Sequence, residues 1–181
     1  MLEAKDLKLN PNKVEQLSPD RWFKFLGFTL GKNKAGVMIR VHKQSLKKAK
    51  AKLKELTARN QGRNVRVVMN KIKIYVSGWL NYYCIASMRR KMQKWDEWLR
   101  RRFRQYIWKQ WKKSKTRVTN LKKLGIPEEY AYMWGNTRLG YWRVAKSPIL
   151  DRSITKEKLV KAGYYELASN YELKRLKHYG I

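Results

Sequence analysis

The 181-residue chain carries 44 Lys and Arg against 13 Asp and Glu, which gives a formal net charge of +31. Its 43% hydrophobic and 13% aromatic residues exclude a disordered basic tail, and nucleic acid is the partner that best neutralises such a charge. A membrane-surface protein is the alternative class, but one amphipathic anchor does not account for eleven tyrosines spread along the chain.

Residues that usually build catalytic or metal sites are scarce. Cys84 is the only cysteine, and His42 and His178 are far apart, so we expect no disulfide framework and no zinc site. The adjacent acids at 96–97 and 128–129 point about 100° apart on a helix, which disfavours a shared metal. We therefore expect no metal, no cofactor and no catalytic residue. The single cysteine indicates a reducing compartment, and we expect a cytoplasmic location. The sequence has no long apolar run and no signal-peptide pattern, so we expect no membrane contact.

The chain begins with polar residues and turn signals at 10–12 and 18–20. An aromatic segment at 22–30 and a β-branched segment at 37–41 flank a glycine-containing turn, which predicts a β-hairpin. An isolated hairpin is barely stable, so we expect it to pack on the following helices or on a missing domain.

Apolar residues recur at helical spacing from Leu46 to Leu56, which predicts a helix with Ser45 as its N-cap. The lysines on its other faces are equally consistent with a solvated surface and with a phosphate-facing one. Residues 65–84 alternate like a strand around Ile74, but their apolar steps of three and four favour a helix, with Gly78 expected to permit close packing.

A third helix is predicted over about 87–111, inside the most basic part of the chain. Residues 88–117 hold thirteen Lys and Arg, two acids and four tryptophans. Arginine is favoured for phosphate contact because its guanidinium fork matches a pair of phosphate oxygens. The first-choice RNA contacts are Arg89, Arg90, Lys91, Arg100, Arg101, Arg104, Lys109, Lys112, Lys113, Lys115 and Arg117, followed by Lys47, Lys48 and Lys52, and then by Arg138 and Arg143.

Aromatic residues near these cations are candidates for stacking on bases. Core packing remains the alternative interpretation for each of them. We assign Trp79, Tyr83 and Trp95 to the core. The stacking candidates are Trp108, Trp111, Tyr141 and Trp142.

Beyond residue 117 the chain breaks into short helices separated by Gly and Pro. Helices are expected over 119–124 and 128–134, and after the turn that starts at 136. Further helices are expected to begin at Ser147-Pro148 and at Thr155, and a last amphipathic segment contains Leu167, Tyr171, Leu173 and Leu176. Together they predict a small helical domain.

Short motifs recur in a fixed order along nearly the whole chain. They are LKLNPNK (7–13), FLGF (25–28), SGWLNYY (77–83), WDEWLRRR (95–102), YIWKQWK (106–112), NLKKLGIP (120–127), GYWR (140–143) and SP (147–148). The set resembles the C-terminal part of a bacterial group II intron reverse transcriptase/maturase of the compact kind that lacks an endonuclease domain. The first two motifs are similar to the end of the polymerase palm, and the others to the maturase-specific region.

This resemblance implies a mainly α fold: a remnant of the palm with a β-hairpin at 1–41, a three-helix thumb bundle at 42–117, and a small helical maturase domain X at 118–181. It also implies that the palm's metal-binding Tyr-Ala-Asp-Asp-type motif would lie upstream of Leu7. We therefore expect this chain not to polymerise on its own, and to be a fragment, a split gene product or a degenerate reading frame.

The function implied is the gripping of structured intron RNA to promote splicing and mobility. One alternative is the duplex-gripping thumb of an RNA-directed DNA polymerase, which would hold an RNA/DNA duplex beside a separate fingers–palm polypeptide. A generic DNA-binding protein is another alternative, and a small-molecule enzyme has no supporting residue constellation.

Overall fold

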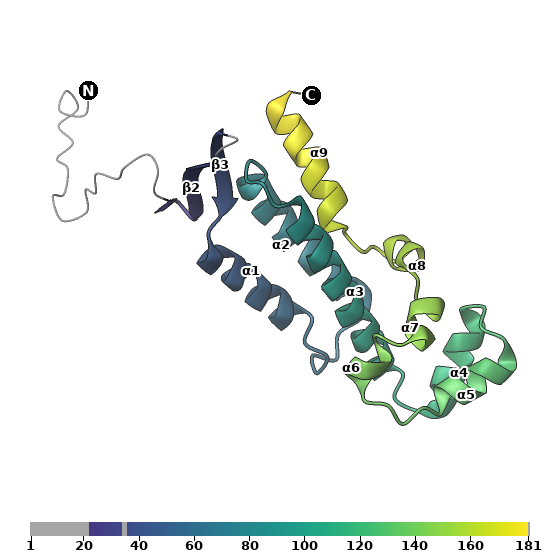
Figure 1. Cartoon of the computed structure of the whole chain (residues 1–181). Helices are drawn as coiled ribbons and strands as arrows, with labels where there is room; N and C mark the ends of the chain where they lie inside the picture. The colour runs from purple at the N-terminus through teal and green to yellow at the C-terminus, as the bar shows by residue number, and fades with distance from the viewer. Residues whose placement is uncertain (1–21, 34–35, 181) are drawn as a thin grey trace, which may run out of the picture.

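The computed structural model describes residues 22–33 and 36–180. Within them a short antiparallel sheet precedes a succession of helices, so the predicted mainly α fold with N-terminal β structure is confirmed (Figure 1). The turn signals at 10–12 and 18–20 and the motif at 7–13 lie outside the described residues.

The sheet has the strand order β1-β2-β3, with β1 at Phe23–Phe25, β2 at Phe28–Asn33 and β3 at Gly36–Val41. A tight turn at Leu26 and Gly27 divides the segment that was predicted to be one strand, because both residues adopt positive φ angles of 47° and 82°. The sheet therefore has three strands in place of two.

The sheet rests on the helices that follow it. The Tyr82 hydroxyl donates to the carbonyl of Leu26 at 2.8 Å, and the Ser45 hydroxyl donates to the carbonyl of Gly27 at 3.1 Å. The ring of Phe28 stacks on Tyr82 with centroids 5.4 Å apart. These contacts stabilise a turn that a leucine disfavours, and they confirm that the N-terminal strands pack on the helices.

Three long helices form the body of the molecule: α1 at Lys43–Leu56, α2 at Val65–Tyr83 and α3 at Arg89–Gln110 (Figure 1). The helical period predicted for each segment is confirmed. Their apolar stripes meet in one core, whose buried members include Ala49, Leu53, Val68, Ile72, Val76, Leu80, Met92, Trp95, Leu99, Phe103 and Tyr106. Trp79 and Tyr83 are partly buried against this core.

Two local predictions in these helices were wrong. The N-cap of α1 is His42 rather than Ser45, and the Nδ1 atom of His42 accepts a hydrogen bond from the backbone N–H of Gln44. Gly78 is exposed, with open space where a Cβ atom would lie, so it permits no close approach. The close helix contact occurs instead at Gly135, where an added Cβ would lie 2.6 Å from Val118.

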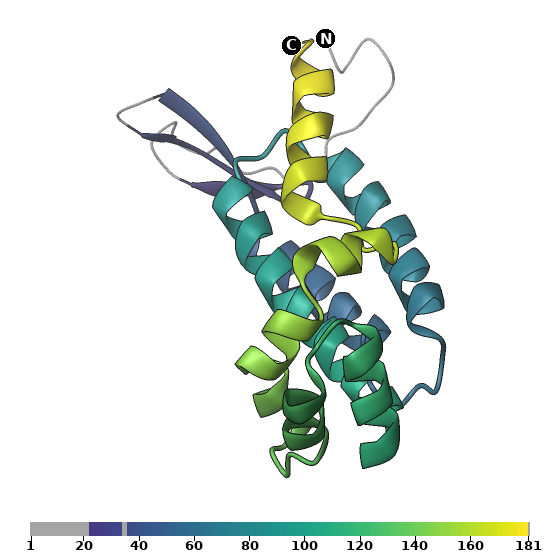
Figure 2. The same ribbon diagram turned by 90° about the vertical axis from the view of Figure 1, so that its right-hand side faces the viewer.

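The remaining helices are short until the last one. The helices α4 and α5 pair at the end of the molecule opposite the sheet, whereas α9 returns along α2 and α3 towards the sheet (Figures 1 and 2). Helix α4 begins before the predicted residue 119, so most of the basic segment after α3 is helical. The bounds are Ser114–Lys123 for α4, Glu128–Gly135 for α5, Tyr141–Val144 for α6, Pro148–Ser153 for α7, Lys156–Lys161 for α8 and Leu167–Tyr179 for α9.

A buried carboxylate fixes the start of α9. Asp96 of α3 accepts hydrogen bonds from the backbone N–H groups of Leu167 at 2.9 Å and Ala168 at 2.8 Å, and from the Tyr164 hydroxyl at 2.5 Å. Burial, and next the neighbouring Asp96 carboxylate, raise the pKa of Tyr164 well above its usual value. Asp96 therefore serves as a distant N-terminal cap that docks α9 on α3.

Candidate nucleic-acid interface

Some of the basic side chains have a structural role at the C-terminal ends of helices, where carbonyl groups lack intrahelical donors and carry partial negative charge. Arg102 of α3 donates to the carbonyls of Lys54 at 2.9 Å and Thr57 at 3.1 Å, and so caps α1. Its Nε group also donates to the Thr57 hydroxyl. Burial lowers the pKa of Arg102, as expected for a cation that is withdrawn from water.

The same role recurs elsewhere in the helical region. Arg117 donates to the carbonyl of Trp111 at the end of α3, and Arg104 donates to the carbonyl of Ile154 at the end of α7, each at 2.9 Å. Lys158 donates to the carbonyl of Leu124 at the end of α4 at 2.6 Å. These cations hold helices together, which reduces the number that are free to bind a ligand.

The sides of α3 towards α7 and α9 carry ion pairs with the protein's own acids. Arg89 pairs with Glu172 at 2.6 Å, and Arg104 pairs with Asp151. Arg100 lines a polar hollow that also contains four carboxylates, those of Asp96, Glu97, Glu166 and Glu172. The folding of α7 and α9 onto α3 thus brings acids against these arginines, and their assignment as RNA contacts stays a prediction.

The stacking candidates differ in the access that a base would have to their rings. Trp108 is 1% exposed and lies beneath the Arg117 guanidinium, 4.7 Å from the ring centroid, so its assignment as a stacking residue was wrong. Trp111 is half-buried and packs 5.8 Å from Trp108. Tyr141 is half-buried between the cations of Arg59 at 4.9 Å and Lys109 at 5.1 Å.

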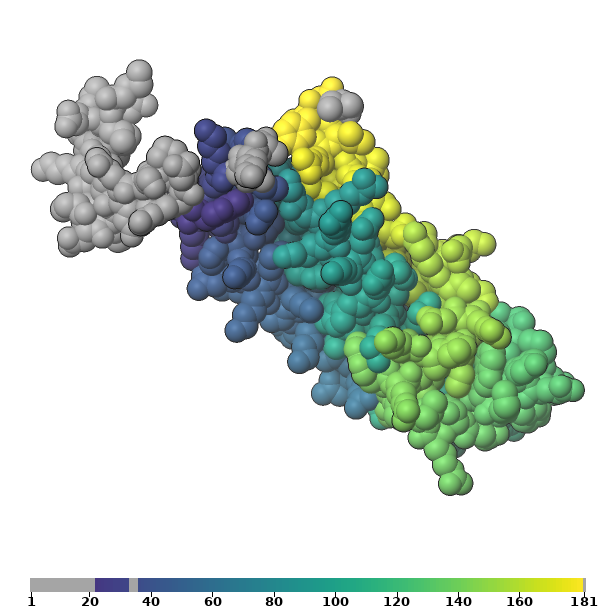
Figure 3. All heavy atoms as spheres, in the orientation of Figure 1, coloured from purple at the N-terminus to yellow at the C-terminus, as the bar shows by residue number. Residues whose placement is uncertain are grey.

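Trp142 is the most accessible of the four predicted stacking residues, with 38% of its surface exposed. It is one of the residues that line an open groove of about 540 Å³ between α1 and α3. Figure 3 shows α1 and α3 next to each other on one face of the molecule. The other lining residues are Lys47, Lys50, Ala51 and Lys54 from α1, and Trp98, Arg102 and Gln105 from α3.

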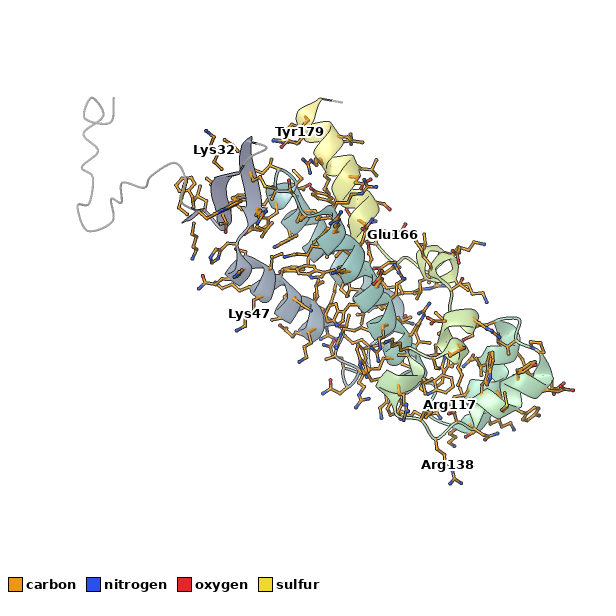
Figure 4. All side chains as sticks on the ribbon, viewed as in Figure 1. Lys32, Lys47, Arg117, Arg138, Glu166 and Tyr179 are labelled. Atoms are coloured by element: carbon orange, nitrogen blue, oxygen red, sulfur yellow. The ribbon has the colours of Figure 1, made fainter. Side chains whose placement is uncertain are left out.

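Helical spacing explains how these residues converge. Positions 47, 50 and 54 are separated by three and four residues and therefore share one side of α1. Positions 98, 102 and 105 share one side of α3 for the same reason. The exposed Lys47 is visible along α1 in Figure 4.

The electrostatics of the groove are one-sided, because its lining residues include four cations and no carboxylate. Aromatic faces replace acids as neighbours for some of these cations. The Lys50 ammonium lies 5.4 Å and the Arg102 guanidinium 5.3 Å from the centroid of Trp98. An incoming anion would meet a positive potential with no competing acid among the lining residues.

The sequence analysis missed part of this groove. Lys50, Lys54, Trp98, Arg102 and Gln105 were not among the predicted site residues. The stripes on α1 and on α3 were both readable from helical periodicity, but nothing in the sequence indicated that these stripes face the same groove.

The other predicted cations lie at several places on the surface. Lys48 and Lys52 are exposed on α1 outside the groove lining, and Lys52 pairs with Glu55 at 2.9 Å. Arg138 projects from the turn before α6, as Figure 4 shows. The structure also leaves Arg90, Lys91, Lys112, Lys113, Lys115 and Arg143 exposed, whereas Arg101 is partly buried against Trp142.

Across residues 22–33 and 36–180, no group of three or more His, Cys, Asp or Glu side chains could hold a metal ion. In the same part of the chain, no helix is long and apolar enough to cross a membrane.

A helical body with a lysine-lined and tryptophan-lined groove is typical of a nucleic-acid-binding protein. Residues 46–125 match the family described as the group II intron, maturase-specific domain. This match supports a maturase fragment of a group II intron protein, and the matched domain is a maturase domain rather than a catalytic one. The match includes nearly all of α1 and the whole of α2, α3 and α4, and therefore both walls of the groove, whereas Trp142 lies outside it. A search of the curated proteins found no match.

Proposed function

We propose that this chain is an RNA-binding maturase module that grips structured intron RNA and promotes its splicing. The observation that carries the proposal is the acid-free groove between α1 and α3, whose walls lie inside the maturase-specific domain. Folding of an intron core brings phosphates together against their mutual repulsion. A row of lysines offsets that repulsion and releases condensed counterions.

In this proposal the protein makes and breaks no bonds. The ribozyme core supplies the chemistry, and the protein shifts the RNA towards its folded state by binding that state more tightly. Recognition would depend on the shape and backbone of the RNA, as is usual for structured RNA. The basic surfaces after α3 and around Arg138 would extend the contact beyond the groove.

The test is a comparison of two ligands of equal length, folded intron RNA and duplex DNA, titrated with the full chain at several salt concentrations. We expect tighter binding to the RNA, with an affinity that falls linearly against the logarithm of the salt concentration. Equal affinity for both ligands would identify a generic DNA-binding protein and contradict a maturase role.

A second candidate function is the duplex-gripping thumb of a polymerase whose fingers and palm are on another polypeptide. The sheet supports this candidate, because it exposes 57% of Phe25, 67% of Leu26 and 79% of Val37 at the end of the molecule opposite α4 and α5. Phe25 and Leu26 lie at the turn between β1 and β2, whereas Val37 pairs with Lys32 near the other end of the sheet. Exposed apolar side chains of this kind suit a protein partner. Primer extension measured with this chain and a fingers–palm fragment, separately and together, distinguishes the candidates. Extension by this chain alone would contradict its role as a purely binding module.

A further inference from the structure

Trp142 is one of the two tryptophans that line the groove, and a cation lies over its ring. The Arg101 guanidinium lies 3.7 Å from the centroid of Trp142 and donates to the Trp142 carbonyl at 2.9 Å. Arg101 lines the neighbouring hollow and not the groove, whereas Trp142 lines both. The cation therefore lies over the indole on the side of the hollow, whereas Trp142 keeps 38% of its surface exposed and also lines the groove.

The cations along the groove also differ in how they are held. Arg102 is fixed by its hydrogen bonds to the carbonyls at the end of α1. Lys47, Lys50 and Lys54 are exposed lysines, and only the flexible Lys50 lies over a ring, that of Trp98. An ammonium group on a flexible stem can leave the ring and follow a phosphate without breaking a helix cap.

The row formed by Lys47, Lys50 and Lys54 has the length of a short piece of nucleic-acid backbone. Seven residues of α-helix separate Lys47 from Lys54, which is about 10 Å at about 1.5 Å per residue. One strand carries a phosphate about every 3.4 Å along a duplex axis and at wider intervals when extended, so the row spans about two or three phosphates. The groove volume of about 540 Å³ is in the usual range for a site that encloses one small ligand.

We propose that this groove binds an unpaired segment of RNA, with one base stacked on the exposed surface of Trp142 and the adjoining phosphates on Lys47, Lys50 and Lys54. The proposal rests on the RNA-binding function proposed above and specifies the part of the RNA that enters the groove. Bases inside a helix are stacked on their neighbours and offer no free face, whereas bases in loops and bulges do. An exposed indole beside a phosphate-binding row therefore selects single-stranded RNA.

The first experiment compares two fluorescein-labelled RNAs, an unstructured 12-mer and a fully paired hairpin with a tight loop, by anisotropy with the full chain. For Trp142→Leu we expect binding of the 12-mer to weaken by about fivefold or more, and binding of the hairpin stem to change by less than about twofold. Trp142→Phe keeps an aromatic face and should recover part of the loss. The matched control is Tyr132→Leu, which removes a 54% exposed aromatic outside the groove and should leave both affinities unchanged.

A second experiment needs no variant and so does not depend on how a substitution folds. The 12-mer carries 4-thiouridine at one position, is crosslinked to the unaltered protein by light, and the attached peptides are sequenced. We expect crosslinks at Trp142 and on the α1 peptide that contains Lys47 to Lys54. Crosslinks confined to other segments, or a Trp142→Leu effect that is equal for both RNAs or absent, would overturn the groove proposal while RNA binding stands. If neither RNA binds the unaltered protein, the proposed function fails as well.

Discussion

The side chain of Asp96, in the middle of α3, accepts a hydrogen bond of 2.9 Å from the backbone N–H of Leu167, the first residue of α9. The two residues are 71 positions apart in the chain. Most helices are capped by a residue directly before them, whereas α9 has no side-chain hydrogen bond from its own N-cap residue, Glu166. The carboxylate that caps the start of α9 therefore comes from α3.

Replacement of Asp96 by Ala should therefore be costly. It would leave two backbone N–H groups at the start of α9 and the Tyr164 hydroxyl without their acceptor, and we expect a loss of about 2–4 kcal/mol in the free energy of unfolding. Urea denaturation measures this loss. The exposed neighbour provides the control, because Glu97→Ala should change stability by less than about 0.5 kcal/mol. Similar costs for the two variants would show that Asp96 does not cap α9.

The Tyr164 hydroxyl predicts a dependence of stability on alkaline pH. Its pKa is raised in the folded protein, by burial and then by Asp96, so the folded state retains the proton more strongly than the unfolded chain does. The contribution of this group is then complete below the unfolded pKa of about 10 and is lost as the pH rises above it towards the folded pKa. Tyr164→Phe should be less stable by about 1 kcal/mol at neutral pH. The difference between the two proteins should shrink above about pH 10, and a constant difference would contradict the raised pKa.

Arg102 is predicted to contribute to stability rather than to supply only charge. Arg102→Ala removes the donors to the carbonyls of Lys54 and Thr57, and we expect a cost of about 1.5–3 kcal/mol in unfolding experiments. Arg90 lies on the same helix and is exposed, so Arg90→Ala removes the same charge with little change in stability. If Arg90→Ala costs as much as Arg102→Ala, the end of α1 does not depend on this cap.

Gly78 offers a stabilising substitution. It lies inside α2 with no atom within 4 Å of the position of a Cβ, and glycine in a helix interior is less favourable than alanine by about 1 kcal/mol. Gly78→Ala should therefore raise the free energy of unfolding by about 0.5–1 kcal/mol. Gly27→Ala should do the opposite, because Gly27 has a φ of 82° and an added Cβ would lie 2.6 Å from the Tyr83 hydroxyl. Thermal denaturation of the two variants side by side checks both signs.

The two outer lysines of the groove should determine part of the salt dependence of RNA binding. Replacing Lys47 and Lys54 together by Ala should reduce the slope of log affinity against log salt by about 1.5, because each lost phosphate contact contributes about 0.7–0.9. The control is the double variant of Lys161 and Lys177, exposed lysines on α8 and α9 outside the groove lining. An equal change in slope for the two double variants would show that total charge, and not the groove, determines the affinity.

Local spacing alone was sufficient to predict most of the elements. The steps of three and four from Val65 to Tyr83 outweighed the β-branched residues between them, since a helix buries a stripe and this stripe is continuous. Ser147-Pro148 and Thr155 marked the starts of α7 and α8 because caps and turns depend on neighbouring residues. The division of the first strand at Leu26 was missed, because its positive φ is stabilised by the distant Tyr82 and not by its neighbours.

Which cations are free was decided only by the tertiary structure. The five arginines look alike in the sequence, but docking of α1, α6, α7 and α9 on α3 gives them acids, carbonyls or an aromatic ring as neighbours. They are Arg89, Arg100, Arg101, Arg102 and Arg104. The helical spacing of the lysines on α1 could be read from the sequence. Only the structure shows that they line one groove together with residues of α3 and Trp142. The sequence by itself determined the total charge and the helical periods, and its short motifs indicated the family, because these depend on composition and on short-range order. The distribution of that charge between structural caps and an open groove depends on contacts between residues far apart in the chain, and only the folded structure specifies them.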